Sequence, residues 1–355
     1  MRNVPKLLYI VEAMGGGIFT YIVTLANGLC DKYDITVAYG IRSETPENIE
    51  DYFDDRVNLV KVKNFQRAVR FGKDRAATKE LKELVKRLKP DIVHLHSSKA
   101  GAIGRLFLKS SKYKMFYTPH GYSFLMEDIR PIRKRVYYAI EKFCAKDHCI
   151  TVACGKGEWE SSLSLDKNAV YISNGVDTKL IDKATYKSVP KENHQFTVFT
   201  VGRMDFQKNP RMFNDIAELL PDVKFVWIGE GELRRQITSK NIETTGWLPR
   251  TKALEIAANQ DVFVLPSRWE GLPLSLLEAM YMKKPCIVSD VIGNRDIVHD
   301  GVTGYICNTP EEFAEKIEEI RNKDNSEIIE NAYEEIINHY NDEWLTHRYA
   351  ELYSE

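Results

Sequence analysis

Short apolar runs alternate along the chain with longer amphipathic segments. The apolar part of each run is four to eight residues long and is bounded by turn residues. With their flanking residues the segments are KLLYIV (6–11), DITVAYG (34–40), DIVHLH (91–96) and KMFYTPH (114–120) in the first half, then QFTVFTVGR (195–203), KFVWIGEG (224–231), DVFVLPS (261–267) and KPCIVSD (284–290) in the second. Such runs are typical of strands buried on both faces, and helices between them imply parallel sheets. The pattern predicts two doubly wound α/β domains.

A polar stretch separates the two series of strands. Residues 182–195, DKATYKSVPKENHQ, contain Pro190 and little apolar periodicity, which indicates a linker. A chain of 355 residues also exceeds the usual span of one hydrophobic core. We therefore predict an N-terminal domain over 1–185 and a C-terminal domain over 186–342.

The last residues form an amphipathic segment, 343–355, that we expect to pack back on the first domain as a strap. Its apolar side chains recur near helical spacing at Trp344, Leu345, Tyr349, Leu352 and Tyr353.

Charge is nearly balanced overall, with a formal net charge of -1, but it is unevenly distributed. Residues 61–90 hold eleven basic and three acidic side chains. A second basic cluster precedes two tyrosines and comprises Arg130, Arg133, Lys134 and Arg135, followed by Tyr137 and Tyr138. Cations beside amphipathic rings suit an anionic lipid surface, whereas a solvated helix face explains the same charges without a partner.

The sequence has no apolar run near ~18 residues and no signal-peptide core, so we expect a cytoplasmic protein. Six cysteines lie mostly in apolar segments, which indicates reduced, buried thiols. Cys144, Cys149 and Cys154 lie near His148, but their spacing does not match a zinc knuckle. We predict no metal site.

In doubly wound sheets ligands bind at the carboxyl ends of the strands, and candidate residues follow several predicted strands. Gly15, Gly16 and Gly17 follow the first strand and open a helix predicted from Ile18 onward. Backbone amides at such a helix start suit an anionic or hydroxyl-rich ligand, although a tight turn alone explains the glycines equally well. The spacing matches neither a dinucleotide fingerprint nor a phosphate loop.

Histidines follow two other strands of the first half. His120 lies between Pro119 and Gly121, so we expect its imidazole to project from a strained loop into a cleft, with a structural role as the alternative. His94 and His96 alternate along a strand end, point the same way and could also line the cleft. A metal site there would need a third ligand, which the sequence does not provide.

In the second half, Arg203 and Lys208 follow one strand across a short turn, and a glycine loop at Gly229 and Gly231 follows the next. A guanidinium and an ammonium group together can neutralise a diphosphate and stabilise it as a leaving group.

The segment RWEGLPLSLLEAM (268–280) follows another strand. Proline favours the first helical position, so we expect a helix from Pro273, with Glu270 in the preceding loop and Glu278 on the second turn. The amides of Leu274 and Ser275 would then face the ligand with the positive end of the helix dipole.

Together these motifs resemble the retaining glycosyltransferases of family 4, which adopt the GT-B fold of two Rossmann-like domains facing across a cleft. The resemblance covers essentially the whole chain and rests on the E-x7-E pair Glu270 and Glu278, the cations Arg203 and Lys208, the turn Asn174-Gly175-Val176-Asp177 and the glycine loop Gly15 to Gly17. It implies a nucleotide-sugar donor on the C-terminal domain and an acceptor on the N-terminal domain.

The resemblance also implies a role for each residue of the donor site. Arg203 and Lys208 would bind the donor diphosphate. Glu278 would accept hydrogen bonds from the ribose hydroxyls, and Glu270 from sugar hydroxyls near C3 and C4. His120 would lie beside the donor sugar. The catalytic candidates are thus Arg203, Lys208, Glu270 and His120.

The remaining donor-binding candidates are the loop Gly15 to Gly17, which would meet the diphosphate and the acceptor, and the helix start at Leu274 and Ser275. Retention of configuration in this family is usually explained by front-face attack, in which the departing diphosphate helps to deprotonate the acceptor hydroxyl. Two carboxylates also suggest a glycosidase-like acid and nucleophile pair. That interpretation fails because about 10–12 Å would separate Glu270 from Glu278, at ~1.5 Å per helical residue plus the loop.

We therefore expect a retaining transferase that moves a hexose or N-acetylhexosamine from a nucleotide-sugar, in particular a UDP-sugar, without a metal or other cofactor. Family members of this size often build capsule, exopolysaccharide or lipopolysaccharide on a lipid diphosphate carrier, so a lipid-linked acceptor and a peripheral position at the inner membrane face are expected. A soluble acceptor would also fit the sequence. The same motifs leave room for a GT-B relative such as a UDP-N-acetylglucosamine 2-epimerase or a phosphorylase, and for a non-catalytic sugar-nucleotide-binding protein.

Overall fold

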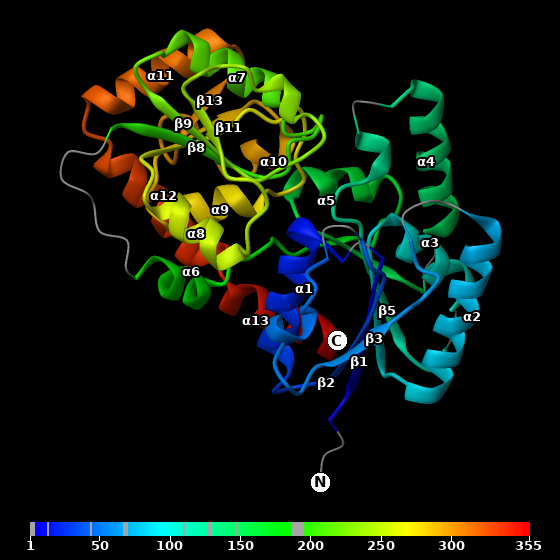
Figure 1. Cartoon of the computed structure of the whole chain (residues 1–355). Helices are drawn as coiled ribbons and strands as arrows, with labels where there is room; N and C mark the ends of the chain where they lie inside the picture. Colours follow the sequence, from blue (N-terminus) through cyan, green and yellow to red (C-terminus); the bar gives the residue numbers. More distant parts are fainter. Residues whose placement is uncertain are drawn as a thin grey trace. The chain divides into compact units, whose positions relative to one another are not determined.

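The computed structural model of the chain describes residues 4–12, 14–42, 45–66, 70–108, 111–126, 129–145, 148–186 and 195–355. The chain divides into two compact units (Figure 1). The first unit contains Met1–Asn174 together with Asp342–Glu355, and the second unit contains Gly175–Asn341. Each unit has its own parallel sheet, as the alternating pattern predicts.

The first unit is built on a sheet that has seven strands in the described part of the chain, in the order β3-β2-β1-β4-β5-β6-β7, all parallel. The strands are β1 (Lys6–Val11), β2 (Asp34–Tyr39), β3 (Asn58–Lys61), β4 (Ile92–His96), β5 (Lys114–Thr118), β6 (Ile150–Ala153) and β7 (Val170–Tyr171). The helices are α1 (Gly16–Leu29), η1 (Ile49–Tyr52), α2 (Phe71–Leu88), α3 (Ser98–Phe107), η2 (Ser123–Leu125), α4 (Pro131–Cys144), α5 (Lys156–Leu163) and α13 (Asp342–Ser354).

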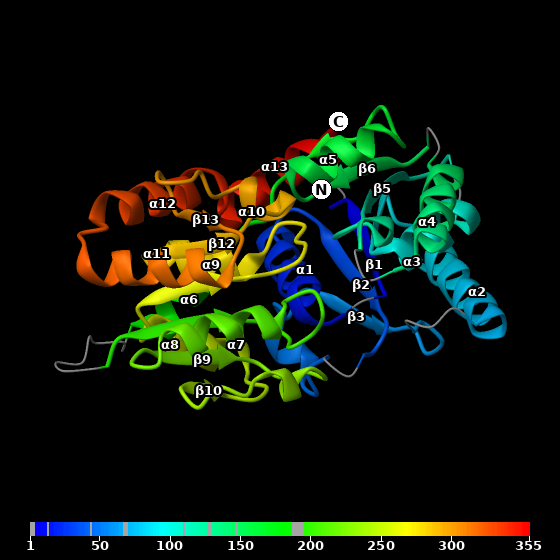
Figure 2. The ribbon, with the colours of Figure 1, turned by 90° about the horizontal axis from the view of Figure 1, so that it is seen from above.

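The two faces of this sheet are covered by different helices (Figure 2). α1 packs on one face together with α13, and α2 and α3 pack on the opposite face. Each face buries a separate apolar cluster, and β1 and β4 contribute side chains to both. The central strands therefore read as continuous apolar runs, whereas the edge strands β3 and β7 are only partly buried and lack such a run.

The second unit is built on a sheet that has six strands in the described residues, in the order β10-β9-β8-β11-β12-β13. The strands are β8 (Thr197–Val201), β9 (Lys224–Ile228), β10 (Ile242–Thr244), β11 (Val262–Leu265), β12 (Cys286–Ser289) and β13 (Tyr305–Cys307). The helices are α6 (Thr178–Thr185), α7 (Pro210–Leu219), η3 (Arg234–Gln236), α8 (Arg250–Ala258), α9 (Leu274–Tyr281), α10 (Ile292–Arg295), α11 (Pro310–Asn322) and α12 (Ser326–His339). α7 and α11 cover one face, and α8, α9 and α12 cover the other.

The boundary between the units lies earlier than the predicted break at 185/186. The amide of Val176 donates a hydrogen bond to the Tyr340 carbonyl at 2.8 Å, and the Asp177 side chain caps α6 by accepting from the Leu180 amide. Ile181, which is 1% exposed, packs in the second core. The predicted linker 182–195 therefore begins inside α6, and its residues 187–194 lie outside the described residues.

The C-terminal helix α13 belongs to the first unit, where the strap was placed. Tyr349 and Tyr353 are buried in the core that α13 shares with α1, and the Tyr21 hydroxyl donates to the Tyr349 oxygen at 2.5 Å. Gly28 permits this close packing, because a Cβ there would lie 2.2 Å from a methyl carbon of Thr346. In the described part of the chain, no helix combines the length and the apolar character needed to cross a membrane.

Candidate active site

Two loops at the carboxyl edge of the second sheet are locked together by glycines. Gly229 has a φ of +140°, and a Cβ there would lie 2.1 Å from the Gly202 carbonyl oxygen. A Cβ on Gly231 would lie 2.5 Å from the Met204 carbonyl oxygen, and the Met204 amide donates to the Glu230 carbonyl at 3.0 Å. Only glycine allows this approach, so the predicted glycine loop fixes the course of the segment that carries Arg203.

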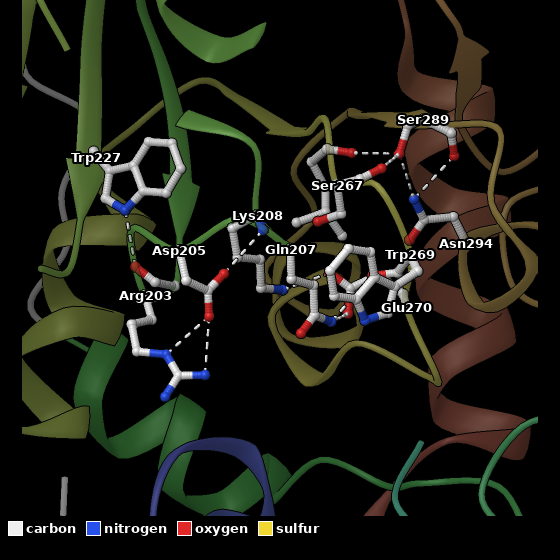
Figure 3. Close-up of polar contacts among 12 residues, drawn as sticks. Arg203, Asp205, Gln207, Lys208, Trp227, Ser267, Trp269, Glu270, Ser289 and Asn294 are labelled. Atoms are coloured by element: carbon white, nitrogen blue, oxygen red, sulfur yellow. Dashed lines mark hydrogen bonds and ion pairs between the residues drawn. The ribbon is translucent and has the colours of Figure 1, made fainter. Parts of the chain in front are cut away.

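Arg203 is held by an aspartate two residues later. Its Nε lies 2.9 Å from Asp205 Oδ2, and its guanidinium forms an ion pair with the same oxygen (Figure 3). The other carboxylate oxygen of Asp205 accepts from the Lys208 amide at 3.0 Å. Asp205 therefore organises the turn that presents both predicted cations, and the Arg203 side chain remains 47% exposed.

Lys208 reaches the loop that follows β11. Its Nζ lies 2.7 Å from Glu270 Oε1, and the two side chains are 17% and 6% exposed. The side-chain nitrogen Nε2 of Gln207 donates to Glu270 Oε2 at 3.2 Å and to the Trp269 carbonyl at 3.0 Å. The structure thus joins Lys208 and Glu270, which the sequence assigned to different parts of a ligand, into one ion pair (Figure 3).

Glu278 forms a second ion pair nearby. Its Oε1 lies 2.6 Å from an Nη atom of Arg250, and the two side chains are 7% and 20% exposed. Burial raises the pKa of Glu278, while Arg250 and then Lys208 act in the opposite direction. Lys208, which pairs with Glu270, thus also acts electrostatically on Glu278.

The helix that carries Glu278 begins one residue later than predicted. α9 starts at Leu274, Pro273 occupies the N-cap position, and no side chain caps the helix. The amides of Leu274 and Ser275 therefore lie in the first turn as expected, at the positive end of the helix dipole.

A group of buried, hydrogen-bonded polar residues lies beside the Glu270 loop. Asn294, which is 0% exposed, donates to the Ser289 carbonyl at 2.9 Å, and Ser289 Oγ donates to the Ser267 carbonyl at 2.5 Å (Figure 3). A Cβ on Gly293 would lie 2.2 Å from the Gly271 carbonyl oxygen. The short helix α10 thus packs directly against the backbone that follows Glu270.

The first unit places His120 at the end of β5 in a left-handed conformation, with φ of 56°. This value confirms the prediction of a strained loop. His120 Nε2 lies 3.0 Å from His96 Nδ1, and the Tyr21 ring packs edge-on at 4.8 Å. Burial lowers the pKa of His120 to about 3. The imidazole is therefore neutral, and its projection into a cleft stays a prediction.

His94 and His96 point the same way, as predicted, with ring centroids 4.1 Å apart. The expectation that His94 and His96 line a cleft is wrong. Both rings are 0% exposed, and the two nitrogens of His94 hydrogen bond to Tyr353 at 2.6 Å and to Thr118 at 2.8 Å. Strand alternation gave the direction of the side chains, but α13 covers this face of the sheet.

The glycine turn begins its helix two residues before the predicted Ile18. α1 starts at Gly16, which has a φ of +56°, and Gly15 is its N-cap. No side chain caps this end of the helix. Gly17 follows in the first turn, so all three glycines lie at a helix N-terminus as expected.

Three charged residues near the carboxyl ends of the two sheets were missed by the sequence analysis. Arg250 opens α8 directly after Pro249, a position that can be recognised from sequence. Glu158 is 3% exposed and accepts from the Gly121 amide at 2.6 Å, which braces the His120 turn. Glu12 directly follows β1 and pairs with Arg42 at 2.8 Å. An acidic residue directly after a buried strand was the available signal.

The cysteines and histidines form no metal site in the part of the chain that the structure describes. All six cysteines are buried and unbridged, which agrees with the expected reduced thiols.

Two family descriptions match the chain. "Glycosyltransferase Family 4" matches residues 15–180, and "Glycosyl transferases group 1" matches residues 182–335. The two matches meet near the boundary between the two units.

Among curated proteins, the chain is 34% identical over 286 residues to the Escherichia coli protein named UDP-Gal:alpha-D-GlcNAc-diphosphoundecaprenol alpha-1,3-galactosyltransferase, covering 73% of each chain. It is 26% identical to a Campylobacter jejuni alpha-1,4-N-acetyl-D-galactosaminyltransferase whose name gives an undecaprenol diphosphate trisaccharide as its substrate, covering 96% of this chain and 97% of that protein.

Solved structures share the fold at low identity. The chain superposes on sucrose-phosphate synthase from Thermosynechococcus elongatus with a TM-score of 0.84, at 16% identity and 98% coverage of both chains. It superposes on Anabaena Alr3699/HepE in complex with UDP and glucose with a TM-score of 0.79, at 17% identity and 99% coverage of both chains.

Proposed function

The chain belongs to the family 4, group 1 glycosyltransferases and has the GT-B fold, and from this premise we propose that it transfers a hexose or N-acetylhexosamine from a UDP-sugar, with retention, to a lipid-linked saccharide. The observation that carries the proposal is the pair of buried carboxylate–cation contacts, Lys208 with Glu270 and Arg250 with Glu278. The four residues of these two contacts lie on loops or helices that follow strands of one sheet.

The donor site combines groups for anions with groups for hydroxyls. Arg203 and Lys208 offer N–H donors to the diphosphate, and their charge stabilises it as it departs. Glu270 and Glu278 are acceptors that suit sugar and ribose hydroxyls. In the proposed complex Lys208 turns from Glu270 to a phosphate oxygen, which frees Glu270 Oε1 for a sugar hydroxyl.

Retention follows if the acceptor hydroxyl attacks from the face that the diphosphate leaves. The C–O bond to the diphosphate breaks, the new glycosidic C–O bond forms, and the acceptor proton moves to a departing phosphate oxygen. No protein nucleophile takes part. His120 is neutral at pH 7, so it offers a hydrogen bond to the sugar rather than a charge. The two cations balance the diphosphate, and we propose that activity requires no divalent ion.

The proposed acceptor is a saccharide on a polyprenyl diphosphate. Two relatives carry names that specify undecaprenol-linked acceptors, and both belong to bacteria. The protein would then act in surface polysaccharide synthesis, such as capsule, exopolysaccharide or lipopolysaccharide, from a peripheral position on the inner membrane face. The basic helix α2 supports this position, because its exposed side chains include Lys73, Lys79, Lys82 and Lys86.

A screen of nucleotide-sugars by thermal shift tests the proposal. The correct donor should raise the melting temperature, since it binds only the folded protein. Transfer assays with that donor, with and without EDTA, should then yield a product of retained configuration on a lipid diphosphate acceptor. Isomerisation of the donor without an acceptor would favour the epimerase, and binding without turnover would favour a non-catalytic protein.

A further inference from the structure

Helix α4 exposes a stripe of apolar side chains. Ile132, Val136 and Ile140 are 63%, 49% and 44% exposed. They are spaced four residues apart, and at about 100° per residue they span an arc of about 80°. Phe143, 65% exposed, lies within the same arc, and the exposed Ala139 lies about 20° outside it. α4 therefore keeps on its outer side the kind of face that other helices of this unit bury.

The opposite side of α4 faces the protein. Glu141 is 4% exposed, and it accepts from Arg105 at 2.5 Å and from the Tyr117 hydroxyl at 3.0 Å. It lies nine residues from Ile132, which places it about 140° around the helix from the middle of the stripe. The tethered side and the apolar side of α4 are thus well separated.

Cations border the apolar stripe on both edges. Arg133 lies on one edge, and Arg135 and Lys142 lie on the other, all of them exposed. The one acidic residue of α4 is Glu141, on the buried side. Every exposed charge of this helix is therefore positive, which is the distribution of a helix that lies in the interface of an anionic bilayer.

The sequence grouped Tyr137 and Tyr138 with the basic cluster and left two interpretations of it, a lipid surface or a solvated helix face. Both tyrosines are half-buried, and Tyr138 packs edge-on against Phe124 at 5.3 Å and hydrogen bonds to Ser164 at 3.4 Å. The outer face is carried instead by the aliphatic residues between the cations.

We propose that α4 is the membrane-docking element of this protein. Its apolar stripe inserts among the headgroups and upper acyl chains of an anionic bilayer while Arg133, Arg135 and Lys142 bind lipid phosphates. The proposal rests on the lipid-linked acceptor proposed above, because docking brings the acceptor-binding unit to the surface where such a substrate lies. It differs from attraction by α2, whose exposed face is polar throughout the part that the structure describes.

Co-sedimentation of the full chain with vesicles of phosphatidylcholine and phosphatidylglycerol, 7:3, tests the docking. The variant Ile132→Ser/Val136→Ser/Ile140→Ser should bind at least about tenfold more weakly, because it loses apolar burial, and serine has nearly the helix propensity of isoleucine and valine. The matched control Leu219→Ser/Val302→Ser changes exposed apolar residues of the second unit, 46% and 51% exposed, and should bind as wild type.

Variants that remove charge distinguish the contribution of α4 to vesicle binding from that of α2. Arg133→Gln/Arg135→Gln/Lys142→Gln should lose about fivefold in binding per charge removed. Lys79→Gln/Lys82→Gln/Lys86→Gln on α2 should lose less and leave the salt-resistant part of binding intact. The proposal is overturned if wild type and the α4 serine variant bind the vesicles equally, or if wild type does not bind them. It is also overturned if sedimentation velocity shows a wild-type dimer that becomes monomeric in the serine variant while vesicle binding is unchanged.

Calorimetry with UDP on the same variants keeps this outcome distinct from that of the proposed function. Loss of vesicle binding with unchanged UDP affinity supports docking by α4. Absence of UDP binding in wild type, with α4-dependent vesicle binding, would instead leave the docking in place and remove the proposed donor.

Discussion

The carboxyl ends of the two sheets differ in the groups that they carry beside their ion pairs. In the second unit the loops present two carboxylate–cation pairs, Lys208 with Glu270 and Arg250 with Glu278. The first unit has a comparable pair, Glu12 with Arg42, but it also carries the neutral ring of His120, stacked on His96. Two sheets of the same architecture thus share buried ion pairs, and only the first adds uncharged histidines that suit neutral hydroxyl groups.

The difference arises from burial. Lys208 and Glu270 are both largely buried, and each compensates the charge of the other. The histidines have no such counter-charge, so burial lowers the pKa of His94, His96 and His120 and keeps them uncharged. Substitutions at the carboxyl end of one sheet and not of the other test this difference between the two units.

Lys208→Ala should have the largest effect on turnover. Loss of a group that stabilises the leaving diphosphate typically reduces kcat about 10²- to 10³-fold. Transfer from the UDP-sugar found in the screen measures it. Lys224→Ala is the control, because Lys224 pairs with the exposed Glu243 in the same unit. Melting temperatures separate the chemical effect from the cost of leaving Glu270 buried without its partner, and near-normal kcat would remove Lys208 from the mechanism.

Glu278→Gln should weaken nucleotide binding more than it alters sugar preference. A hydrogen bond to a charged group contributes about 1.5–3 kcal/mol, so the Kd for UDP should rise about 10- to 100-fold. Glu270→Gln should do the reverse and mainly change selectivity among UDP-sugars. Calorimetry with UDP and several UDP-sugars measures both, with Glu255→Gln as an exposed control. The opposite ranking would show that the two carboxylates exchange roles.

Acid should destabilise the first unit in particular. Its buried histidines bind protons in the unfolded chain below pH ~6.5, but His120 in the folded chain only near pH 3. The unfolded state therefore binds more protons as the pH falls below ~6.5, and each such histidine removes about 1.4 kcal/mol per pH unit from the free energy of unfolding.

Glu278 in the second unit acts with the opposite sign. Its pKa in the folded protein is raised, so its protonation adds stability as the pH falls from that value toward ~4.5. Hydrogen exchange of β4 and β11 between pH 7 and pH 5, corrected for intrinsic rates, compares the units. The β4 slope should shrink in His120→Asn, and equal slopes for both strands would contradict the comparison.

His120→Asn should lower kcat about tenfold while the Kd for UDP stays unchanged, because it removes about one hydrogen bond to the sugar. Asparagine tolerates the left-handed conformation that His120 adopts, so the turn is retained. Single-turnover transfer measures the effect. A change in UDP affinity of the same size would instead assign His120 to the nucleotide.

Tyr353→Phe should have the smallest effect. It removes the 2.6 Å hydrogen bond to His94 Nδ1 within the first core, at a cost of about 1–3 kcal/mol in unfolding free energy for the group left unsatisfied. Kd for UDP should not move. Urea unfolding measures the loss, and Tyr186→Phe, 86% exposed, is the control. A stability equal to wild type would show that the hydrogen bond between Tyr353 and His94 does not stabilise the packing of α13.

The sequence predicted the central strands of both sheets, because β1, β4, β8 and β11 are buried on both faces and read as continuous apolar runs. It missed short strands such as β3, β10 and β13, which lie at or near an edge where one side of the strand is less buried. The break at Asn174 was missed for a different reason: the hydrogen bond from Val176 to Tyr340 joins residues far apart in the chain.

The candidate site shows the same division. Arg203, Lys208, Glu270 and Glu278 were found because their types, order and spacing in one chain match a family pattern. Their pairing was not found, since Lys208 and Glu270 lie 62 positions apart in the chain. The helix start at Arg250 can be recognised from the sequence, but the partners of Arg250 and Glu158 cannot, because folding alone places each charge against a distant group.

The sequence by itself thus determined the two parallel sheets, the family and the residue types at the proposed donor site, because strand burial and loop chemistry are local properties. Tertiary structure alone decided which charge neutralises which, that His94 belongs to a core closed by α13, and that α4 turns Ile132, Val136 and Ile140 outward. Each of these depends on which side of a helix or strand is covered by a distant part of the chain, and local patterning does not encode that.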